Sequence, residues 1–115
     1  MQKDDLVYVG HMLDMARKAE EKIKGKNRSD YDRDENLRMA LTHLIQVIGE
    51  AARHVSPEFQ REHQGIPWKN IIGMRNKVVH DYMHVDYDIL WDVVTADLPS
   101  LITELLNILP PEEAS

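Results

Sequence analysis

An apolar seam between residues 34 and 55 constrains the fold of this chain more than any other feature of its sequence. Apolar side chains recur there at alternating spacings of four and three residues, at Leu37, Leu41, Leu44, Ile48, Ala51 and Val55. This spacing places them along one side of an α-helix. Further apolar residues flank the seam and widen it, namely Ala40, Ile45, Val47 and Ala52. The pattern therefore predicts a helix from Asp34 to His54 or Val55 that is buried on more than one side.

Four other segments supply helices to cover this seam. Apolar periodicity and capping signals predict that they span residues 3–24, 56–63, 66–80 and 86–109, with residues 25–30 as a loop. Proline at the first helical position favours the starts at Pro57 and Pro67, and Asp86 is a plausible N-cap. Gly73 should permit close approach of a neighbouring helix or of a partner's backbone. Pro99 should kink or restart the last helix, because it removes one backbone hydrogen bond.

The sequence thus predicts an all-α bundle of four main helices plus one short helix, folded as a single domain over residues 1–115. The chain has no cysteine, which fits a reducing, cytoplasmic setting. The polar residues at the N-terminus are not followed by the apolar segment of a signal peptide, so we expect none. No apolar run approaches the roughly 20 residues that a membrane span needs, so no membrane association is expected.

The net charge limits the kind of nucleic-acid binding that this chain can support. The formal value is −6 at pH 7. Broad, non-specific attachment to a phosphate backbone requires a basic face, and this composition argues against one. A nucleic-acid substrate would have to be held locally, by the few basic residues around Arg75 and Lys77.

The stretch from Gly73 to Tyr82 contains the side chains best suited to chemistry. Arg75 supplies a permanent cation with a planar set of donors, and Asn76 supplies a hydrogen-bonding amide. His80 supplies an imidazole, and Tyr82 a phenol. Such a set suits a phosphate ester, because arginine can hold the non-bridging oxygens while histidine moves a proton.

The spacing of these residues limits how their side chains can come together in space. On a continuous helix Arg75 and Tyr82 project in nearly the same direction, whereas His80 lies about 140° around the axis from Arg75. The three converge only if the helix ends near His80 or if a second subunit contributes its own motif. Cleavage of RNA without metal needs one group to take the 2′-OH proton and another to protonate the leaving 5′ oxygen. A two-fold dimer would supply two histidines for these roles.

Two other interpretations of the motif stay open at this point. An arginine and a histidine near a helix C-terminus also complement the helix dipole and cap its last carbonyls. His80 and His84 are four residues apart and could bind a metal as a pair. No acidic residue, however, lies at a spacing typical of a third metal ligand. Asp81 and Asp86 fit solvated or capping roles better. We therefore predict no metal and no cofactor.

From residue 37 onward the sequence resembles the HepT-like branch of the HEPN domains, the toxin half of a bacterial and archaeal toxin–antitoxin pair. The matching stretches are residues 48–52, 66–68 and 73–82, and Trp91 followed by residues 97–101. Within them an arginine and a histidine are separated by four residues, and a tyrosine stands two positions after the histidine. That arrangement is specific, whereas an arginine and a histidine alone would be weak evidence.

The resemblance implies a HEPN domain that dimerises and cleaves RNA without metal, as the toxin of a type VII HEPN/MNT system. It assigns catalysis to Arg75 and His80, with Asn76 as a supporting polar group, and it matches Glu50 to an acidic position that HEPN domains place beside the motif. It also implies a partner, a minimal nucleotidyltransferase antitoxin that transfers AMP from ATP to the motif tyrosine, here Tyr82. The added charge and adenosine would block the cleft where RNA phosphate should sit.

Two alternatives accompany this interpretation. Glu50 belongs to a polar stripe that a solvated helix face explains equally well, made of His43, Gln46, Glu50, Arg53 and His54. The whole chain could also be a catalytically silent interaction module that binds a nucleotide or a nucleotidyltransferase. The acidic net charge favours this second function slightly, and the intact motif favours the ribonuclease more strongly.

Overall fold

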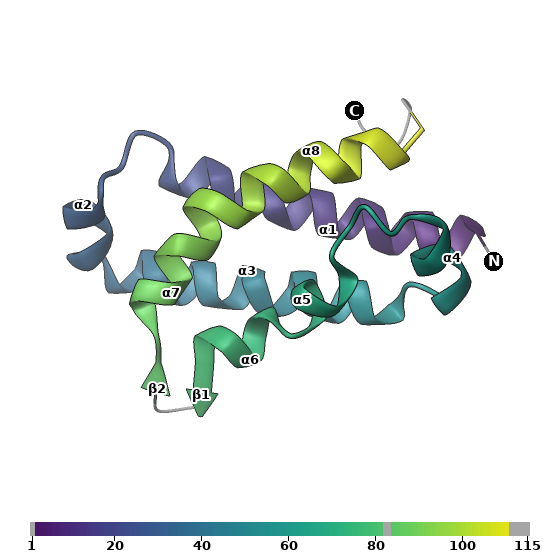
Figure 1. The fold of residues 1–115 in the computed structure, drawn as a ribbon. Coiled ribbons are helices and arrows are strands. Elements are labelled where there is room, and N and C mark those ends of the chain that lie inside the picture. The colour runs from purple at the N-terminus through teal and green to yellow at the C-terminus, as the bar shows by residue number, and fades with distance from the viewer. Residues whose placement is uncertain (1, 82–83, 111–115) are drawn as a thin grey trace.

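Helix α3 (Glu35–His54) packs against helices both before and after it in the computed structural model, which describes residues 2–81 and 84–110 (Figure 1). It begins as predicted, because the Asp34 side chain caps it by accepting a hydrogen bond from the Leu37 backbone N–H at 2.9 Å. Every residue of the predicted seam is buried. The expected all-α bundle is confirmed, with its hydrophobic core centred on this helix.

Helix α1 (Gln2–Ile23) lies along α3, and its bounds differ from the predicted ones by one residue at each end. A buried polar contact joins its start to the end of α3. Asp5, only 4% exposed, accepts hydrogen bonds at 2.8 Å from both the backbone N–H and the hydroxyl of Ser56. Ser56 in turn caps the short helix α4 (Pro57–Glu62), as the sequence predicted. One carboxylate therefore ties together three helices.

The loop predicted for residues 25–30 is wrong in its second half, where helix α2 (Arg28–Asp32) forms. Asn27 and Asp30 build a reciprocal capping box, each side chain accepting a hydrogen bond from the other's backbone N–H. Tyr31 anchors the helix because its side chain is fully buried. The local capping box and the tertiary packing of Tyr31 therefore outweigh the polar composition of this stretch.

The helix predicted from residue 66 to near His80 is two short helices, α5 (Trp68–Ile72) and α6 (Met74–Val78), joined at Gly73. Trp68, Ile71 and Val79 are buried as expected, and Ile72 is half-buried. The close helix approach expected at Gly73 instead falls at Gly49 of α3. A Cβ atom there would lie 3.3 Å from the carbonyl oxygen of Ile71, so glycine lets the end of α5 approach α3.

Past Val78 the chain becomes extended and forms a small antiparallel ladder of β1 (Val79–Asp81) and β2 (His84–Val85). The motif helix is therefore shorter than predicted. The Val78 carbonyl accepts a hydrogen bond at 2.7 Å from the backbone N–H of Asp86, a partner beyond β2. The consecutive valines at 78 and 79 also favour an extended chain. In Figure 1 this ladder projects from the bundle below α7.

The last predicted helix is continuous in direction but divided into α7 (Tyr87–Asp92), a π-helical turn (Val93–Asp97) and α8 (Leu98–Ile108). Asp86 caps it as expected, accepting from the Ile89 N–H at 3.0 Å. Pro99 lies in the first turn of α8, where it has no N–H to bond to the preceding turn, and the wider π-helical turn takes up that gap. The predicted kink or restart at this proline thus takes the form of a π-helical turn just before it, within a helix that continues. Within the described ranges no helix is long and apolar enough to cross a membrane.

Candidate active site

Helix α6 divides the first half of the motif between the core and solvent. Met74 and Val78 are buried, whereas Arg75, Asn76 and Lys77 are exposed. Successive helical residues are separated by about 100°, so these three form a continuous polar strip across the outer face of α6. The Arg75 guanidinium lies 3.4 Å from the side-chain oxygen of Asn76, which accepts a hydrogen bond from it. The strip therefore presents a cation and an amide together to solvent.

His80 occupies a β-bulge in the small ladder. Val79 pairs with Val85 and Asp81 pairs with His84, so β1 advances two residues where β2 advances one. His80 is the extra residue between the two pairs, and its side chain is 60% exposed. Bulges redirect side chains and are frequent beside active sites. This geometry frees His80 from the 140° offset that a continuous helix would impose relative to Arg75.

A carboxylate faces the imidazole of His80. Its Nε2 lies 3.9 Å from Oδ2 of Asp86, whose other oxygen accepts the hydrogen bond from Ile89. The backbone of Asp86 is held as well, by its bond to the Val78 carbonyl. Sequence reasoning assigned Asp86 only a capping role. Asp86 lies close to His80 because β1 pairs with β2. The six-residue separation of His80 and Asp86 in the sequence does not indicate this pairing.

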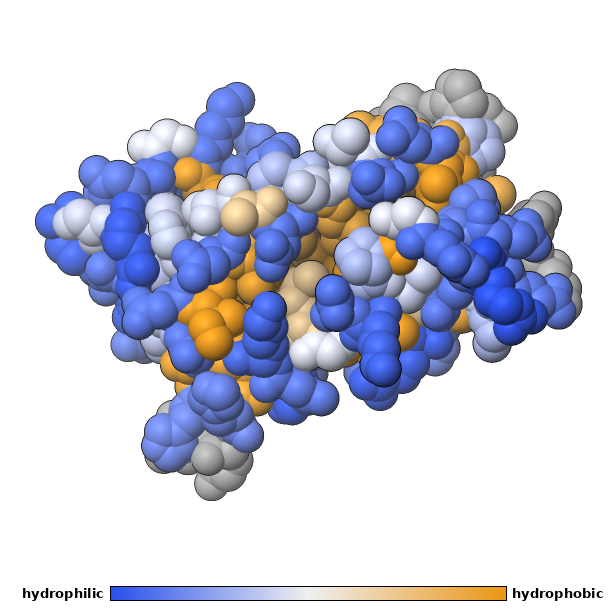
Figure 2. Space-filling view, in the orientation of Figure 1, coloured by the Kyte–Doolittle hydropathy of each residue, from blue (hydrophilic) through white to orange (hydrophobic). Residues whose placement is uncertain are grey.

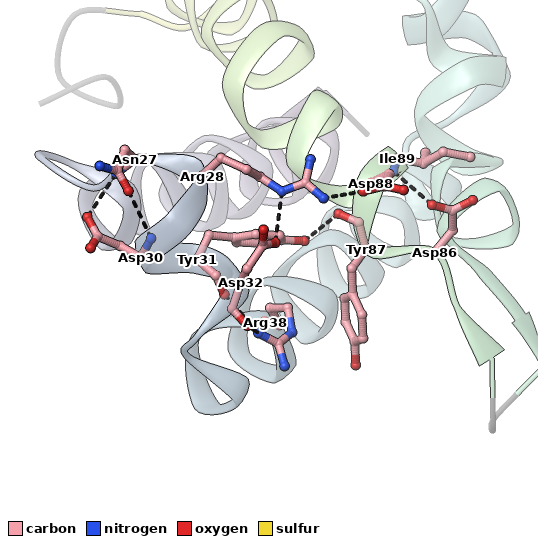
Figure 3. A network of polar contacts seen from close by, with 10 residues as sticks. All are labelled: Asn27, Arg28, Asp30, Tyr31, Asp32, Arg38, Asp86, Tyr87, Asp88 and Ile89. Atoms are coloured by element: carbon pink, nitrogen blue, oxygen red, sulfur yellow. Dashed lines mark hydrogen bonds and ion pairs between the residues drawn. The ribbon is translucent and has the colours of Figure 1, made fainter.

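A polar network fixes the start of α7 immediately after Asp86 (Figure 3). The hydroxyl of Tyr31 donates a hydrogen bond to the carbonyl oxygen of Tyr87 at 2.6 Å. Burial raises the pKa of Tyr31, so its phenol stays protonated as a donor. The guanidinium of Arg38 donates to the Tyr31 carbonyl at 2.8 Å and lies 5.0 Å from the centre of the Tyr87 ring. Helices α2 and α3 thereby hold the segment that carries Asp86.

An ion-pair cluster extends the same network at the surface. The Arg28 guanidinium contacts the carboxylates of both Asp32 in α2 and Asp88 in α7 (Figure 3). The hydrogen bond with Asp32, and after it the one with Asp88, raises the pKa of Arg28. Because these groups are largely exposed, the cluster orients α2 against α7 and adds little stability.

The structure places Glu50 on the exposed face of α3, 3.7 Å from Arg53 one turn further along the same helix. The other members of the polar stripe are also exposed, and the ring of His54 stacks on Tyr8 at 5.1 Å between centroids. Tyr82, the expected acceptor of AMP, lies outside the described residues. Among the described residues, no three histidine, aspartate or glutamate side chains are grouped closely enough to hold a metal ion.

The structure therefore brings Arg75 together with Asn76, and His80 together with Asp86, at the exposed end of a helical bundle. The fold and this motif define a protein of the HEPN class. Residues 12–108 match the model of the family described as ribonuclease HepT-like, and the chain belongs to that family.

Individual relatives agree with this assignment. A protein of Caldanaerobacter subterraneus named "Putative RNase" is 34% identical over 106 residues, which cover 92% of this chain and 95% of the relative. "Probable ribonuclease HepT" of Thermococcus cleftensis is 38% identical over 72 residues, or 63% of this chain and 66% of that protein. A Methanocaldococcus jannaschii protein named "Gamma-glutamylcyclotransferase and putative RNase" is 35% identical over 109 residues, 95% of this chain but only 49% of the relative. No solved structure gives a significant match.

Proposed function

We propose that this chain is a metal-independent endoribonuclease, the toxin of a HEPN/MNT toxin–antitoxin pair, with Arg75 and His80 as its catalytic residues. The observation that carries the proposal is the form of the motif. The α6 helix exposes Arg75, and the β-bulge exposes His80 just beyond the end of that helix. Membership of a ribonuclease family supports RNA as the substrate class.

The proposed reaction needs no group beyond those that two motifs supply. A base takes the proton of the 2′-OH, the 2′ oxygen attacks phosphorus, and an acid protonates the 5′ oxygen as its bond to phosphorus breaks. Two His80 side chains, one from each subunit, would serve as base and acid. The Arg75 guanidinium would stabilise the charge on the non-bridging oxygens, with Asn76 supporting it. Asp86 would orient His80 without contacting the substrate.

A homodimer is part of this proposal because one motif provides one histidine. The interface should include the segment around residues 73–80. Sedimentation velocity at micromolar concentration should show a dimer. A monomer that still cleaves RNA would refute this arrangement and would place both proton transfers within one chain.

Regulation completes the proposal. A nucleotidyltransferase antitoxin would transfer AMP from ATP to the hydroxyl of Tyr82, releasing pyrophosphate, and so block the cleft with negative charge and an adenosine. We propose Glu50 as an acidic group beside the motif. Its ion pair with Arg53 fits a purely structural role at the surface equally well.

Induced expression tests the function directly. Wild-type protein should arrest growth and degrade cellular RNA, whereas matched expression of His80→Ala should do neither. If both forms leave growth and RNA intact while the chain binds a nucleotidyltransferase, the chain is the silent interaction module, the function that its net charge of −6 favours.

A further inference from the structure

A cavity of about 360 Å³ lies between the segment that carries the motif and the C-terminal helix. Its floor is apolar and buried, formed by Ile71, Met74, Val93 and Leu101. Its rim carries polar groups, from Asn70, Lys77, Asp97, Ser100 and Glu104. Figure 2 shows this hollow in the middle of the displayed face, between α8 and α5, with apolar surface at depth and hydrophilic surface around it. An apolar floor with a few polar groups is the usual character of a small-molecule site.

Acidic groups dominate one wall of the cavity. Asp97, Ser100 and Glu104 are spaced by three and four residues, so they lie on one face, from the end of the π-helical turn to the middle of α8. Asp97 ends the π-helical turn, an irregularity that is frequent at functional sites. Across the cavity, a Cβ atom at Gly65 would lie 3.4 Å from Oε2 of Glu104, so the glycine leaves room for that carboxylate. Two carboxyl groups thus stand on one wall, above the apolar floor of the cavity.

The motif and the cavity are connected by the polar strip on α6. Arg75 and Lys77 are about 200° apart on this helix, and exposed Asn76 lies between them on its outer face. Lys77 reaches the rim of the cavity. An RNA strand with a phosphate on Arg75 can therefore cross α6 over Asn76, and a phosphate further along the strand can meet Lys77 at the mouth of the cavity.

We propose that the cavity binds the base of a nucleotide near the cleaved phosphate, and that Asp97 and Glu104 select guanine. This inference rests on the proposed ribonuclease function and adds the base preference of the site. The neutral base occupies the cavity, because two carboxylates repel a phosphate there, and the phosphate of that nucleotide stays at Lys77.

Guanine is favoured by the donors on its pairing edge. Its N1–H and N2 amino groups stand side by side and can both donate to carboxylate oxygens, while the Asn70 amide can donate to O6. Uracil presents two carbonyl oxygens around a single N–H, so it leaves carboxylate oxygens facing its own acceptors. A carboxylate that accepts hydrogen bonds from guanine loses them with uracil and faces a carbonyl oxygen instead, which weakens uracil binding.

Nucleotide binding to the His80→Ala protein tests the proposal without any cleavage. Guanosine, adenosine, cytidine and uridine 5′-monophosphates are each titrated while the methyl signals of Met74, Ile71 and Leu101 are followed by NMR. Guanosine monophosphate should bind about tenfold or more tightly than uridine monophosphate and should shift all three signals. Asp97→Asn and Glu104→Gln should each remove most of that preference. Asp14→Asn, at an exposed position of α1, is the matched control and should leave it unchanged.

Several results would overturn the inference. Equal binding of the four nucleotides, or binding that leaves the floor methyls unshifted, would show that the cavity does not read a base. Shifts that depend on protein concentration alone would show that a second copy of the chain covers the cavity. Cleavage of RNA with no preference for guanine near the cut would refute the inference and leave the ribonuclease standing. Selective guanine binding without cleavage by the wild type would instead refute the proposed function.

Discussion

The hydrogen bond from Tyr31 to Tyr87 gives the sharpest test of how the fold holds its motif. Tyr31 is fully buried, its hydroxyl lies 2.6 Å from the Tyr87 carbonyl oxygen, and its ring lies 4.8 Å from that of Trp91. Tyr31→Phe removes the hydroxyl and keeps the ring. We expect a loss of about 1 kcal/mol in the free energy of unfolding, the usual net value of one such bond. For a chain of this size that loss corresponds to a fall in Tm of about 4 °C.

The same substitution has a distinctive dependence on pH. Burial raises the pKa of Tyr31 above its ordinary value of 10.0, so the folded protein keeps the phenol neutral while the unfolded chain ionises. The stability that this group contributes is complete below pH 10 and is lost as the pH rises above 10, by about 1.4 kcal/mol per pH unit. Tyr31→Phe lacks this loss. The gap of about 1 kcal/mol between variant and wild type should therefore close near pH 11.

Urea unfolding followed by circular dichroism between pH 7 and pH 11 measures both effects. Tyr8→Phe is the control, since Tyr8 is only half-buried, and it should stay within about 0.5 kcal/mol of wild type. The reasoning fails if Tyr31→Phe matches wild type at pH 7. It also fails if the difference between the two proteins stays constant as the pH rises.

Three further predictions concern the core, the candidate site and its regulation. Leu44→Ala should lower the free energy of unfolding by ~2–5 kcal/mol in the same urea assay, because it leaves a cavity at a buried position; a loss below 1 kcal/mol would contradict the packing described. Asp86→Asn should keep the helix cap and the stability of the fold while slowing RNA cleavage up to about fivefold. Asp86→Ala should also lower the free energy of unfolding by about 1 kcal/mol, because it removes the cap. Equal cleavage by Asp86→Asn and wild type would show that Asp86 has no role beside His80. With a cognate nucleotidyltransferase and ATP, peptide mapping should find adenylyl groups on Tyr82 and none at that position in Tyr82→Phe; silencing without this label would favour steric occlusion.

Long periodic segments and strong caps could be predicted from the sequence because their signals are local. The apolar seam of α3 and the caps at Ser56 and Asp86 are examples, and all are confirmed. Helix α2 was missed although its signal is also local, because the capping box of Asn27 and Asp30 sits in a polar stretch that resembles a loop. Glycine and small polar residues in that stretch indicated a loop instead.

The arrangement of the candidate site could not be predicted in the same way. The end of α6 at Val78 depends on a hydrogen bond from Asp86, and the bulge at His80 depends on the register of two very short strands. Both are contacts between residues whose relative positions only the tertiary fold decides. The sequence could therefore supply the types of the side chains, and the conditions for their convergence, but not the bulge that exposes His80. Tyr82 lies outside the described residues, so its exposure remains a prediction.

Cleavage of a defined RNA in the presence of EDTA tests the central claim most directly. Wild-type protein should cut the RNA without added metal, leave 2′,3′-cyclic phosphate or 3′-phosphate ends, and spare DNA of the same sequence, because DNA lacks the 2′-OH. Arg75→Ala and His80→Ala should both be inactive while retaining wild-type helicity and thermal stability, since both side chains are exposed. Activity that disappears in chelator and returns with magnesium, or a His80→Ala protein that still cuts, would contradict the account.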